Sequence, residues 1–304
     1  MFEKIALIGI GLIGASVSHG IRRAHLAKSI AVSTRREATL AAAKRLGLGD
    51  NYAIDPADAV RGADLVLISA PVMAYEAIMH QISSSLEAGA ILSDVGSVKR
   101  HAHNMLGKNL PDNVHLVPGH PIAGTEQSGP SAGFAELFDN RWCVLTPHEN
   151  VDRGAVDKMT AFWRALGSNV ELMDADHHDR VLAITSHLPH LIAYNIVGTV
   201  ADLETDTQSE VVKFSASGFR DFTRIAASDP VMWRDVFLTN RVAVLEMMDR
   251  FLADLTKLQA AVKSGDGVAL EAMFKRTRDI RRSIIDAGQE TAEADFGRPH
   301  GKDM

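Results

Sequence analysis

The chain has a single cysteine, no long basic stretch and no long apolar run, and each shortage excludes a class of protein. Cys143 is the only cysteine in 304 residues, so no intrachain disulfide can form and a reducing compartment fits. The formal net charge is −6, and without a basic run nucleic acid is not an expected partner. No run of about 18 apolar residues predicts a membrane span, and no signal peptide is recognised. We therefore expect a cytoplasmic protein that does not bind a membrane.

A glycine-rich turn near the N-terminus is the most informative feature that is present. The apolar run 4–8 leads directly into Gly9-Ile10-Gly11-Leu12-Ile13-Gly14, and a helix-compatible segment follows. This is the G-x-G-x-x-G pattern in its strand–turn–helix context, which predicts dinucleotide binding at the N-terminus of the helix. Gly9 permits the turn, Gly11 admits a pyrophosphate and Gly14 allows the helix to pack closely on the strand. The residues expected at this cofactor site are Gly9, Gly11, Leu12, Ile13 and Gly14.

Strand and helix patterns alternate through the first half of the chain. Apolar residues are 46 % and charged residues 23 %, as in globular proteins, and the length allows two domains. Helical patterns at 15–23 and 37–46 separate the first strands. The predicted strands are 4–8, 29–33, 63–70, 90–95, 114–117, 142–146 and 169–173. This alternation predicts an α/β fold, with an N-terminal Rossmann-type doubly wound sheet in residues 1–174 that binds NAD(P).

The pattern becomes helical after Asp174. Residues 175–289 are predicted to form an all-α C-terminal domain for substrate binding and dimerisation, in which Pro189 kinks or breaks a helix. The segment 231–262 is apolar on more than one face, which predicts a homodimer. Residues 290–304 form a polar tail that we expect to fray.

The end of the second strand bears on cofactor choice. An NAD-selective Rossmann domain usually places a carboxylate there, which binds the ribose 2′-hydroxyl and repels a 2′-phosphate. Here the run has no carboxylate before Glu37, and hydroxyl and guanidinium groups suit a phosphate. NADP is therefore predicted to be preferred, with NAD possible, although the two arginines could simply begin a solvated helix. The residues concerned are Ser33, Thr34, Arg35 and Arg36.

Two polar residues follow predicted strands at the edge where parallel sheets bind ligands. Ser97 follows the strand 90–95 and either caps the next helix or faces the nicotinamide and substrate. His120 lies between Gly119 and Pro121, so its backbone has little freedom, which suits a positioned base. The alternative for His120 is a structural hydrogen bond in a loop.

The helical half also holds polar candidates. Ser186-His187-Leu188-Pro189-His190 places two histidines three residues apart, but no neighbouring carboxylate completes a metal site, so no metal is expected. Arg220, Arg224 and Arg234 suit a substrate that carries a carboxylate, or they pair with nearby aspartates on the surface. Trp233, taken alone, is more typical of a core.

Five blocks of the sequence together resemble the prephenate/arogenate (cyclohexadienyl) dehydrogenase family of tyrosine biosynthesis. They occur in the family's order, and the blocks that begin at Gly119 and Ser186 are far more specific than the glycine fingerprint. The blocks are Gly9–Ser16, Asp94–Lys99, Gly119–Gly129, Ser186–His190 and Gly218–Trp233. The resemblance implies oxidative decarboxylation of prephenate and/or arogenate, giving 4-hydroxyphenylpyruvate and/or tyrosine, with hydride transfer to NADP or NAD.

The resemblance also implies roles for individual residues. His120 would accept the proton of the substrate hydroxyl, Ser97 would hydrogen-bond that hydroxyl and the cofactor, and Arg224 would bind the side-chain carboxylate. The other substrate-site residues that it implies are His187, His190 and Trp233. The separate roles of the two histidines, and the choice between prephenate and arogenate, stay open. Inhibition by tyrosine, if present, would act at the active site itself.

Two other functions are compatible with parts of this pattern. A β-hydroxyacid-type dehydrogenase also joins a Rossmann domain to a helical domain, but it needs a helical lysine that residues 176–201 lack. A non-catalytic redox sensor would bind the dinucleotide but would not need His120 and Arg224 together.

Overall fold

A computed structural model describes residues 1–125, 127–203, 210, 213–214 and 216–286. The chain divides into two compact units, Met1–Met247 and Met248–Met304, and all the candidate site residues belong to the first. The proposed domains 1–174 and 175–289 stay a prediction. The polar tail expected at 290–304 lies outside the described residues.

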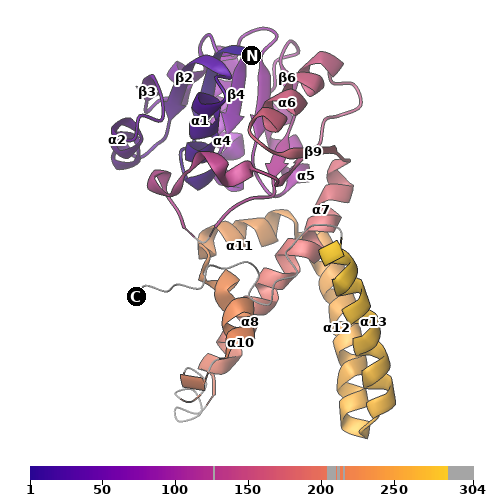
Figure 1. Cartoon of the computed structure of the whole chain (residues 1–304). Coiled ribbons are helices and arrows are strands. Elements are labelled where there is room, and N and C mark those ends of the chain that lie inside the picture. Colours follow the sequence, from indigo (N-terminus) through magenta and orange to yellow (C-terminus); the bar gives the residue numbers. More distant parts are fainter. Residues whose placement is uncertain (126, 204–209, 211–212, 215, 287–304) are drawn as a thin grey trace. The chain divides into compact units, whose positions relative to one another are not determined.

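A six-stranded parallel sheet lies at the centre of the first unit, in the order β3-β2-β1-β4-β5-β6 (Figure 1). The order grows outward from β1 in both directions, which confirms the doubly wound fold. The sequence pattern does not predict β3, whose three residues are too few for a periodicity to show. The strands are β1 (Phe2–Ile8), β2 (Ala27–Ser33), β3 (Asn51–Ala53), β4 (Leu65–Ile68), β5 (Ile91–Asp94) and β6 (His115–Leu116).

Helices cover both faces of this sheet because successive strand residues point to opposite sides. In β1, Leu7 belongs to one buried cluster and Ile8 to the other. The cluster with Leu7 includes residues of α1 (Leu12–Arg23), α2 (Glu37–Arg45) and α6 (Arg153–Ala165). The cluster with Ile8 includes residues of α3 (Pro56–Val60), α4 (Tyr75–Ile82) and α5 (Lys99–Gly107). Short 3₁₀ turns lie at η1 (Val72–Ala74), η2 (Ser83–Ser85), η3 (Pro130–Ala132) and η4 (Ala135–Phe138).

The last two predicted strands do not extend the main sheet, as the continuous series of strands had implied. They form a separate three-stranded sheet with a short strand that contains His120. Its members are β7 (Gly119–Pro121), β8 (Trp142–Leu145) and β9 (Asn169–Leu172). β7 and β8 run antiparallel, so the chain reverses between them, whereas β9 pairs parallel with β8.

The first helical segment after the sheets is a continuous run across Pro189. It consists of α7 (Ala175–Leu182), a π-helical segment η5 (Ala183–His187) and α8 (Leu188–Ala201). Proline has no N–H, and its ring crowds the preceding turn. The wider π turn before Pro189 accommodates both, so the predicted interruption is a π segment and not a break.

The same run, Ala175–Ala201, is long and apolar enough to cross a membrane by length and composition alone, with a mean hydropathy of 1.2. Such helices also occur in cores and at subunit interfaces, so this finding is weak evidence for a membrane. Only 28 % of its apolar window is buried in this single chain.

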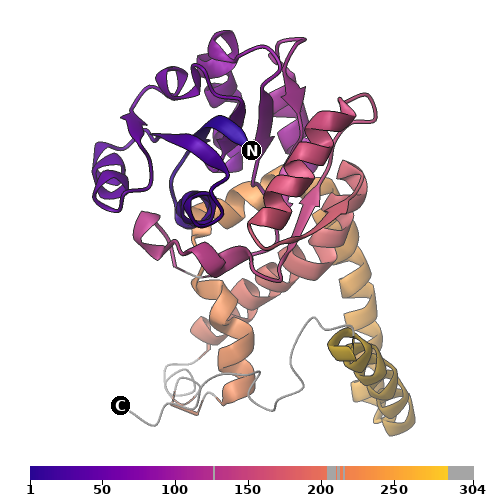
Figure 2. The same ribbon diagram turned by 45° about the horizontal axis from the view of Figure 1, so that its top comes forward.

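The described residues after β9 are otherwise helical, which confirms the all-α C-terminal region. The remaining elements are α10 (Ser217–Thr223), a 3₁₀ turn η6 (Arg224–Ala227), α11 (Pro230–Thr239), α12 (Arg241–Ser264) and α13 (Gly267–Asp286). Helix α11 lies beside the α/β layer (Figures 1 and 2). Its residues Trp233 and Val236 form a small cluster with Val98, which follows β5. The second unit contains the end of α12 and α13, which are joined at Gly265, where φ is +65°.

Candidate active site

His120, on β7, is in direct contact with the helical part of the first unit. Its Nδ1 atom lies 2.9 Å from Nε2 of His178, which is on α7. The Nδ1 atom of His178 lies 2.8 Å from Oδ1 of Asp179. All three side chains are buried. The fold thus connects His120 to a histidine–aspartate pair that sequence reasoning did not select.

Asp179 also caps the helix that follows Ser97. Its carboxylate accepts hydrogen bonds from the backbone N–H groups of Lys99 at 2.8 Å and Arg100 at 2.9 Å. The N-cap residue of α5 is Val98, which has no side-chain capping bond. Ser97 therefore does not cap the helix, and this alternative is wrong. Ser97 is half-buried in the turn between β5 and α5.

A buried ion pair fixes the backbone beside His120. Nζ of Lys99 lies 2.6 Å from both carboxylate oxygens of Asp94 and 2.5 Å from the carbonyl oxygen of Gly119. The hydroxyl of Tyr75 donates to the same carboxylate at 2.8 Å, and burial and this carboxylate hold the pKa of Tyr75 well above its usual value. Gly119 immediately precedes His120, so the ion pair holds β7 against the end of β5.

The electrostatic environment keeps His120 neutral. Burial is the main cause that lowers the pKa of His120 well below its usual value. The neighbouring His178, Lys99 and His187 lower it further. A neutral imidazole can accept a proton at pH 7, and this is the protonation state that a general base needs.

His187 lies at the end of the π segment with a fixed orientation. The amide nitrogen of Asn240 donates both to the carbonyl oxygen of Asp179 at 2.9 Å and to Nδ1 of His187 at 3.0 Å. Because Nδ1 accepts, the ring proton of His187 is on Nε2. Burial lowers the pKa of His187 to about 4, so the ring stays neutral at pH 7.

Two buried N–H groups in this region have no partner among the described residues: Nε2 of His187 and Nε1 of Trp233. The ring centroids of His187 and Trp233 lie 6.0 Å apart. His190 stacks on Trp233 with a centroid distance of 3.6 Å. A buried donor without an acceptor is costly and usually has a ligand or water as partner. These atoms are therefore suited to bind oxygen atoms of a substrate.

The three arginines of this region have different surroundings. Arg234 pairs with Asp235 at 2.7 Å, as the surface alternative predicted. Arg224, at the start of η6, is close enough to lower the pKa of His190, although burial of His190 is the larger cause. Both Arg220 and Arg224 are exposed.

The glycine turn has the shape that a dinucleotide needs. Gly9 has φ of +90°, and a Cβ atom there would lie 2.7 Å from the carbonyl oxygen of Ser69. A Cβ atom on Gly14 would lie 2.6 Å from the carbonyl oxygen of Gly9. On Gly11 it would meet no atom within 4 Å, and this residue is the N-cap of α1 without a side-chain cap. Leu12 and Ile13 begin α1, so their backbone N–H groups lie at the helix N-terminus beside the open space at Gly11, where the sequence predicts a pyrophosphate.

The residues at the end of β2 differ in how far they are exposed to solvent. Ser33 is buried, and its hydroxyl donates to the carbonyl oxygen of Ile54 at 3.4 Å. Thr34 is half-buried, whereas Arg35 and Arg36 are exposed and have no ion-pair partner among the described residues. Ser33 is thus already engaged within the protein, while the two guanidinium groups are accessible.

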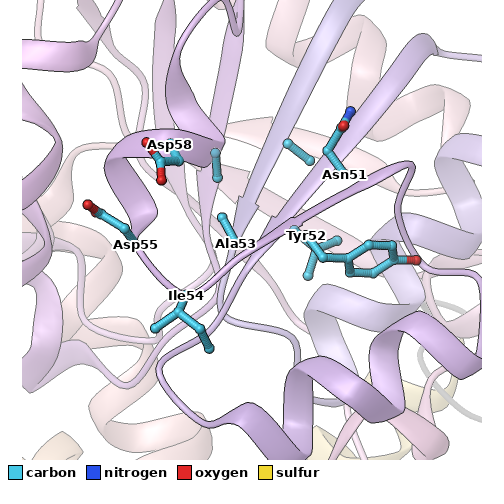
Figure 3. A pocket seen from close by; sticks show the side chains of 9 residues that line it. Asn51, Tyr52, Ala53, Ile54, Asp55 and Asp58 are labelled. Carbon is cyan, nitrogen blue, oxygen red and sulfur yellow. The ribbon is translucent and has the colours of Figure 1, made fainter.

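A hollow of about 570 Å³ lies at the edge strand β3, beside α3 (Figure 3). Asp55 and Asp58, which line it, respectively cap α3 and pair with Arg61. None of the candidate catalytic residues lines this hollow. Within the described residues no group of three or more metal-ligating side chains is close enough to hold an ion, and the absence of a metal stays a prediction.

Sequence reasoning missed several residues that surround His120. Asp94 and Lys99 lie inside the block that was matched to the family, and the position of Asp94 at the end of a strand was a usable signal. His178, Asp179 and Asn240 stand on ordinary helices, and no local pattern distinguishes them.

Fold and site together define a dinucleotide-dependent dehydrogenase with a buried histidine at the carboxyl end of its sheet. The sequence model of the prephenate dehydrogenase nucleotide-binding domain matches residues 17–172, and that of the prephenate dehydrogenase dimerization domain matches residues 174–276. The chain is 41 % identical to the cyclohexadienyl dehydrogenase of Zymomonas mobilis, over 93 % of this chain and 97 % of that protein. It is 33 % identical to the prephenate dehydrogenase of Bacillus subtilis, over 93 % of this chain and 76 % of that protein.

Solved structures give the same result. The prephenate dehydrogenase of Aquifex aeolicus, crystallised with hydroxyphenyl propionate and NAD⁺, is 30 % identical with a TM-score of 0.85, covering 93 % of this chain and 99 % of that chain. The chain belongs to the prephenate dehydrogenase family, whose dehydrogenases act in tyrosine biosynthesis, and it contains that family's nucleotide-binding domain. The β-hydroxyacid dehydrogenase and redox-sensor alternatives are not favoured.

The glycine turn provides a prediction with a matched control. Gly9→Ala should lower the free energy of unfolding by more than about 1 kcal/mol, because an alanine at positive φ is strained and its Cβ atom meets backbone. Gly11→Ala should leave stability nearly unchanged but weaken cofactor binding by about tenfold or more, because its methyl group projects into the open space. Urea unfolding and cofactor titration measure the two effects. Wild-type cofactor affinity in Gly11→Ala would show that the pyrophosphate does not lie there.

Proposed function

We propose that this chain catalyses the oxidative decarboxylation of prephenate and/or arogenate, with His120 as the general base. When bound, the nicotinamide supplies the acceptor for the hydride that leaves the hydroxyl-bearing ring carbon. The hydroxyl proton goes to His120, and carbon dioxide leaves as the ring becomes aromatic. The observation that carries the proposal is the burial of a neutral His120 at the carboxyl end of the sheet, in contact with the helical region. Ser97, in the turn after β5, is proposed to hydrogen-bond the substrate hydroxyl and the cofactor.

The helical elements supply the substrate contacts in this proposal. His187 and Trp233 offer neutral N–H donors without protein acceptors, and these suit carboxylate or carbonyl oxygens of the substrate. Arg224 supplies a positive charge for the side-chain carboxylate. His190, stacked on Trp233, forms part of the wall. Tyrosine resembles the product, so inhibition of the enzyme by tyrosine would be competitive with the substrate at this site. The enzyme would act in the cytoplasm.

The central test is turnover of prephenate and the effect of His120→Asn. Asparagine is similar in size but is not a base, so kcat should fall by roughly 10²–10⁴ while the dissociation constant of the cofactor changes little. For the wild type, kcat should fall as pH drops through the pKa of His120, which lies below its usual value, because the protonated ring accepts no proton.

Steady-state kinetics with prephenate, and separately with arogenate, measure both effects, and the pH series extends from neutral pH to well below the usual histidine pKa. A His120→Asn variant with wild-type kcat would remove this residue from the mechanism. A wild-type enzyme that turns over neither substrate with either cofactor would overturn the proposed function.

The cofactor preference proposed here is NADP over NAD. The end of β2 has no carboxylate, and the exposed Arg35 and Arg36 are available to pair with a 2′-phosphate. Arg35→Ala should lower kcat/KM for NADP and leave the value for NAD almost unchanged. Kinetics with both cofactors decide this, and a wild-type ratio in favour of NAD would contradict it. Lys28→Ala is a suitable control, because Lys28 pairs with Glu3 at the opposite end of the same strand.

A homodimer formed through the helical region completes the proposal. Large apolar side chains are exposed in the isolated chain, including Leu238 at 61 %, Val242 at 81 % and Val262 at 66 %. Exposed apolar positions of this kind are typical of subunit interfaces. Sedimentation at micromolar concentration should therefore show a dimer, and a monomer would contradict the proposal. Val242→Asp should weaken the association, whereas a surface charge change at Glu76 should not.

A further inference from the structure

The histidine–aspartate pair behind His120 has no role in the function proposed so far. His178 and Asp179 are neighbours on α7, and both are buried, His178 completely. They extend a hydrogen-bonded chain from His120 Nδ1 through the His178 ring to the Asp179 carboxylate, with atom separations of 2.9 and 2.8 Å. A buried polar chain of this kind is costly unless each member has a partner.

The direction of every hydrogen bond in this chain follows from its far end. Two backbone amides, of Lys99 and Arg100, donate to the carboxylate of Asp179. Backbone N–H groups can only donate, so these bonds fix the carboxylate as an acceptor. The third contact to this carboxylate must then be the Nδ1–H group of His178.

The protonation state of His178 then fixes which atom of His120 donates. Burial lowers the pKa of His178, so its ring is neutral and carries one proton, on Nδ1. Nε2 of His178 therefore accepts, and Nδ1 of His120 must donate to it. The single proton of the neutral His120 ring is then on Nδ1, and its Nε2 atom holds the lone pair that a base requires.

We propose that His178 and Asp179 are positioning residues that hold His120 in the Nδ1–H tautomer, with Nε2 free to take the hydroxyl proton of the substrate. The inference rests on the proposed function for the identity of that proton donor. In this step the O–H bond of the substrate breaks and an N–H bond forms at Nε2 of His120. The resulting His120 imidazolium still donates a hydrogen bond from Nδ1–H to Nε2 of His178. Asp179 does not take a proton.

A purely structural role is the competing explanation, because Asp179 also caps α5. One variant separates the two roles, and a second tests the direction of the hydrogen bonds. His178→Phe removes the hydrogen-bonded connection and leaves the cap intact. Asp179→Asn keeps the shape, but its amide N–H₂ group replaces one of the two oxygens that accept the backbone N–H groups, so this variant also weakens the cap. With the N–H₂ group toward Nδ1 of His178, it favours a His178 ring protonated on Nε2 and reverses the chain. Asp176→Asn is the matched control, since this carboxylate on the same helix pairs with Arg100 at the exposed surface.

The first measurement is the tautomer of His120, read from the ¹⁵N shifts of histidine-labelled protein, with the signals assigned from the His120→Asn spectrum. The wild type should show a protonated Nδ1 atom and an unprotonated Nε2 atom. Asp179→Asn should shift the population toward the Nε2–H form, and Asp176→Asn should not. A wild-type His120 protonated on Nε2 would overturn the proposal, and this readout does not depend on activity.

The second measurement is the split between kcat and KM with prephenate. Where an amide replaces the carboxylate behind a catalytic imidazole, the wrong tautomer lowers kcat by about 10⁴. We expect falls of about 10²–10⁴ in kcat for Asp179→Asn and His178→Phe, with KM changed by less than about threefold. His178→Gln, which can still accept from His120, should recover at least about tenfold of the loss in His178→Phe. Wild-type kcat in a folded His178→Phe would show that the pair is structural only.

The proposed function and the positioning role of His178 and Asp179 can be contradicted separately. If the wild type turns over neither prephenate nor arogenate, the proposed function fails, while the tautomer measurement still decides the hydrogen-bonded chain. If turnover is present but neither His178→Phe nor Asp179→Asn changes kcat or the tautomer, the positioning role alone fails.

Discussion

The interaction on which the site depends is the contact of one buried carboxylate with the N-terminus of α5. Asp179 comes from α7, yet it accepts the first backbone N–H groups of a helix that belongs to the sheet-covering layer. The unpaired N–H groups and the dipole of a helix N-terminus stabilise a negative charge. Each hydrogen bond to a charged group contributes about 1.5–3 kcal/mol. This contact therefore joins the helical elements to the α/β layer at the point where the candidate catalytic groups meet.

The same helix begins with a second buried charge. Lys99, the first residue of α5, is fully buried against Asp94 and the carbonyl oxygen of Gly119. A buried ion pair contributes little net stability, because desolvation offsets the attraction, but losing one partner is strongly destabilising. Its effect here is geometric, since Gly119 precedes His120. His120 is thus held through its neighbouring backbone by Lys99 and through its ring by His178.

The helical side of the candidate site shows the opposite condition, buried polar groups without partners among the described residues. The N–H groups of His187 and Trp233 are buried and unpaired among the described residues, next to the π turn that ends at His187. Unpaired buried donors lower the stability of the free protein, and π turns often occur at functional sites. A ligand that carries oxygen acceptors would relieve this cost on binding, which gives a physical reason for the location of the site.

The sequence by itself determined the elements whose signal is local. The glycine turn after β1, the alternation of strand and helix and the helical second half follow from spacing and from the backbone freedom of glycine. It also selected His120, Ser97, His187, Arg224 and Trp233, because short motifs surround them. Only the tertiary structure decided that β8 and β9 form a separate sheet with β7, since antiparallel pairing depends on where the chain reverses. It alone brought His178, Asp179 and Asn240 to the site, because contacts between residues about 60 positions apart leave no periodic trace in the sequence.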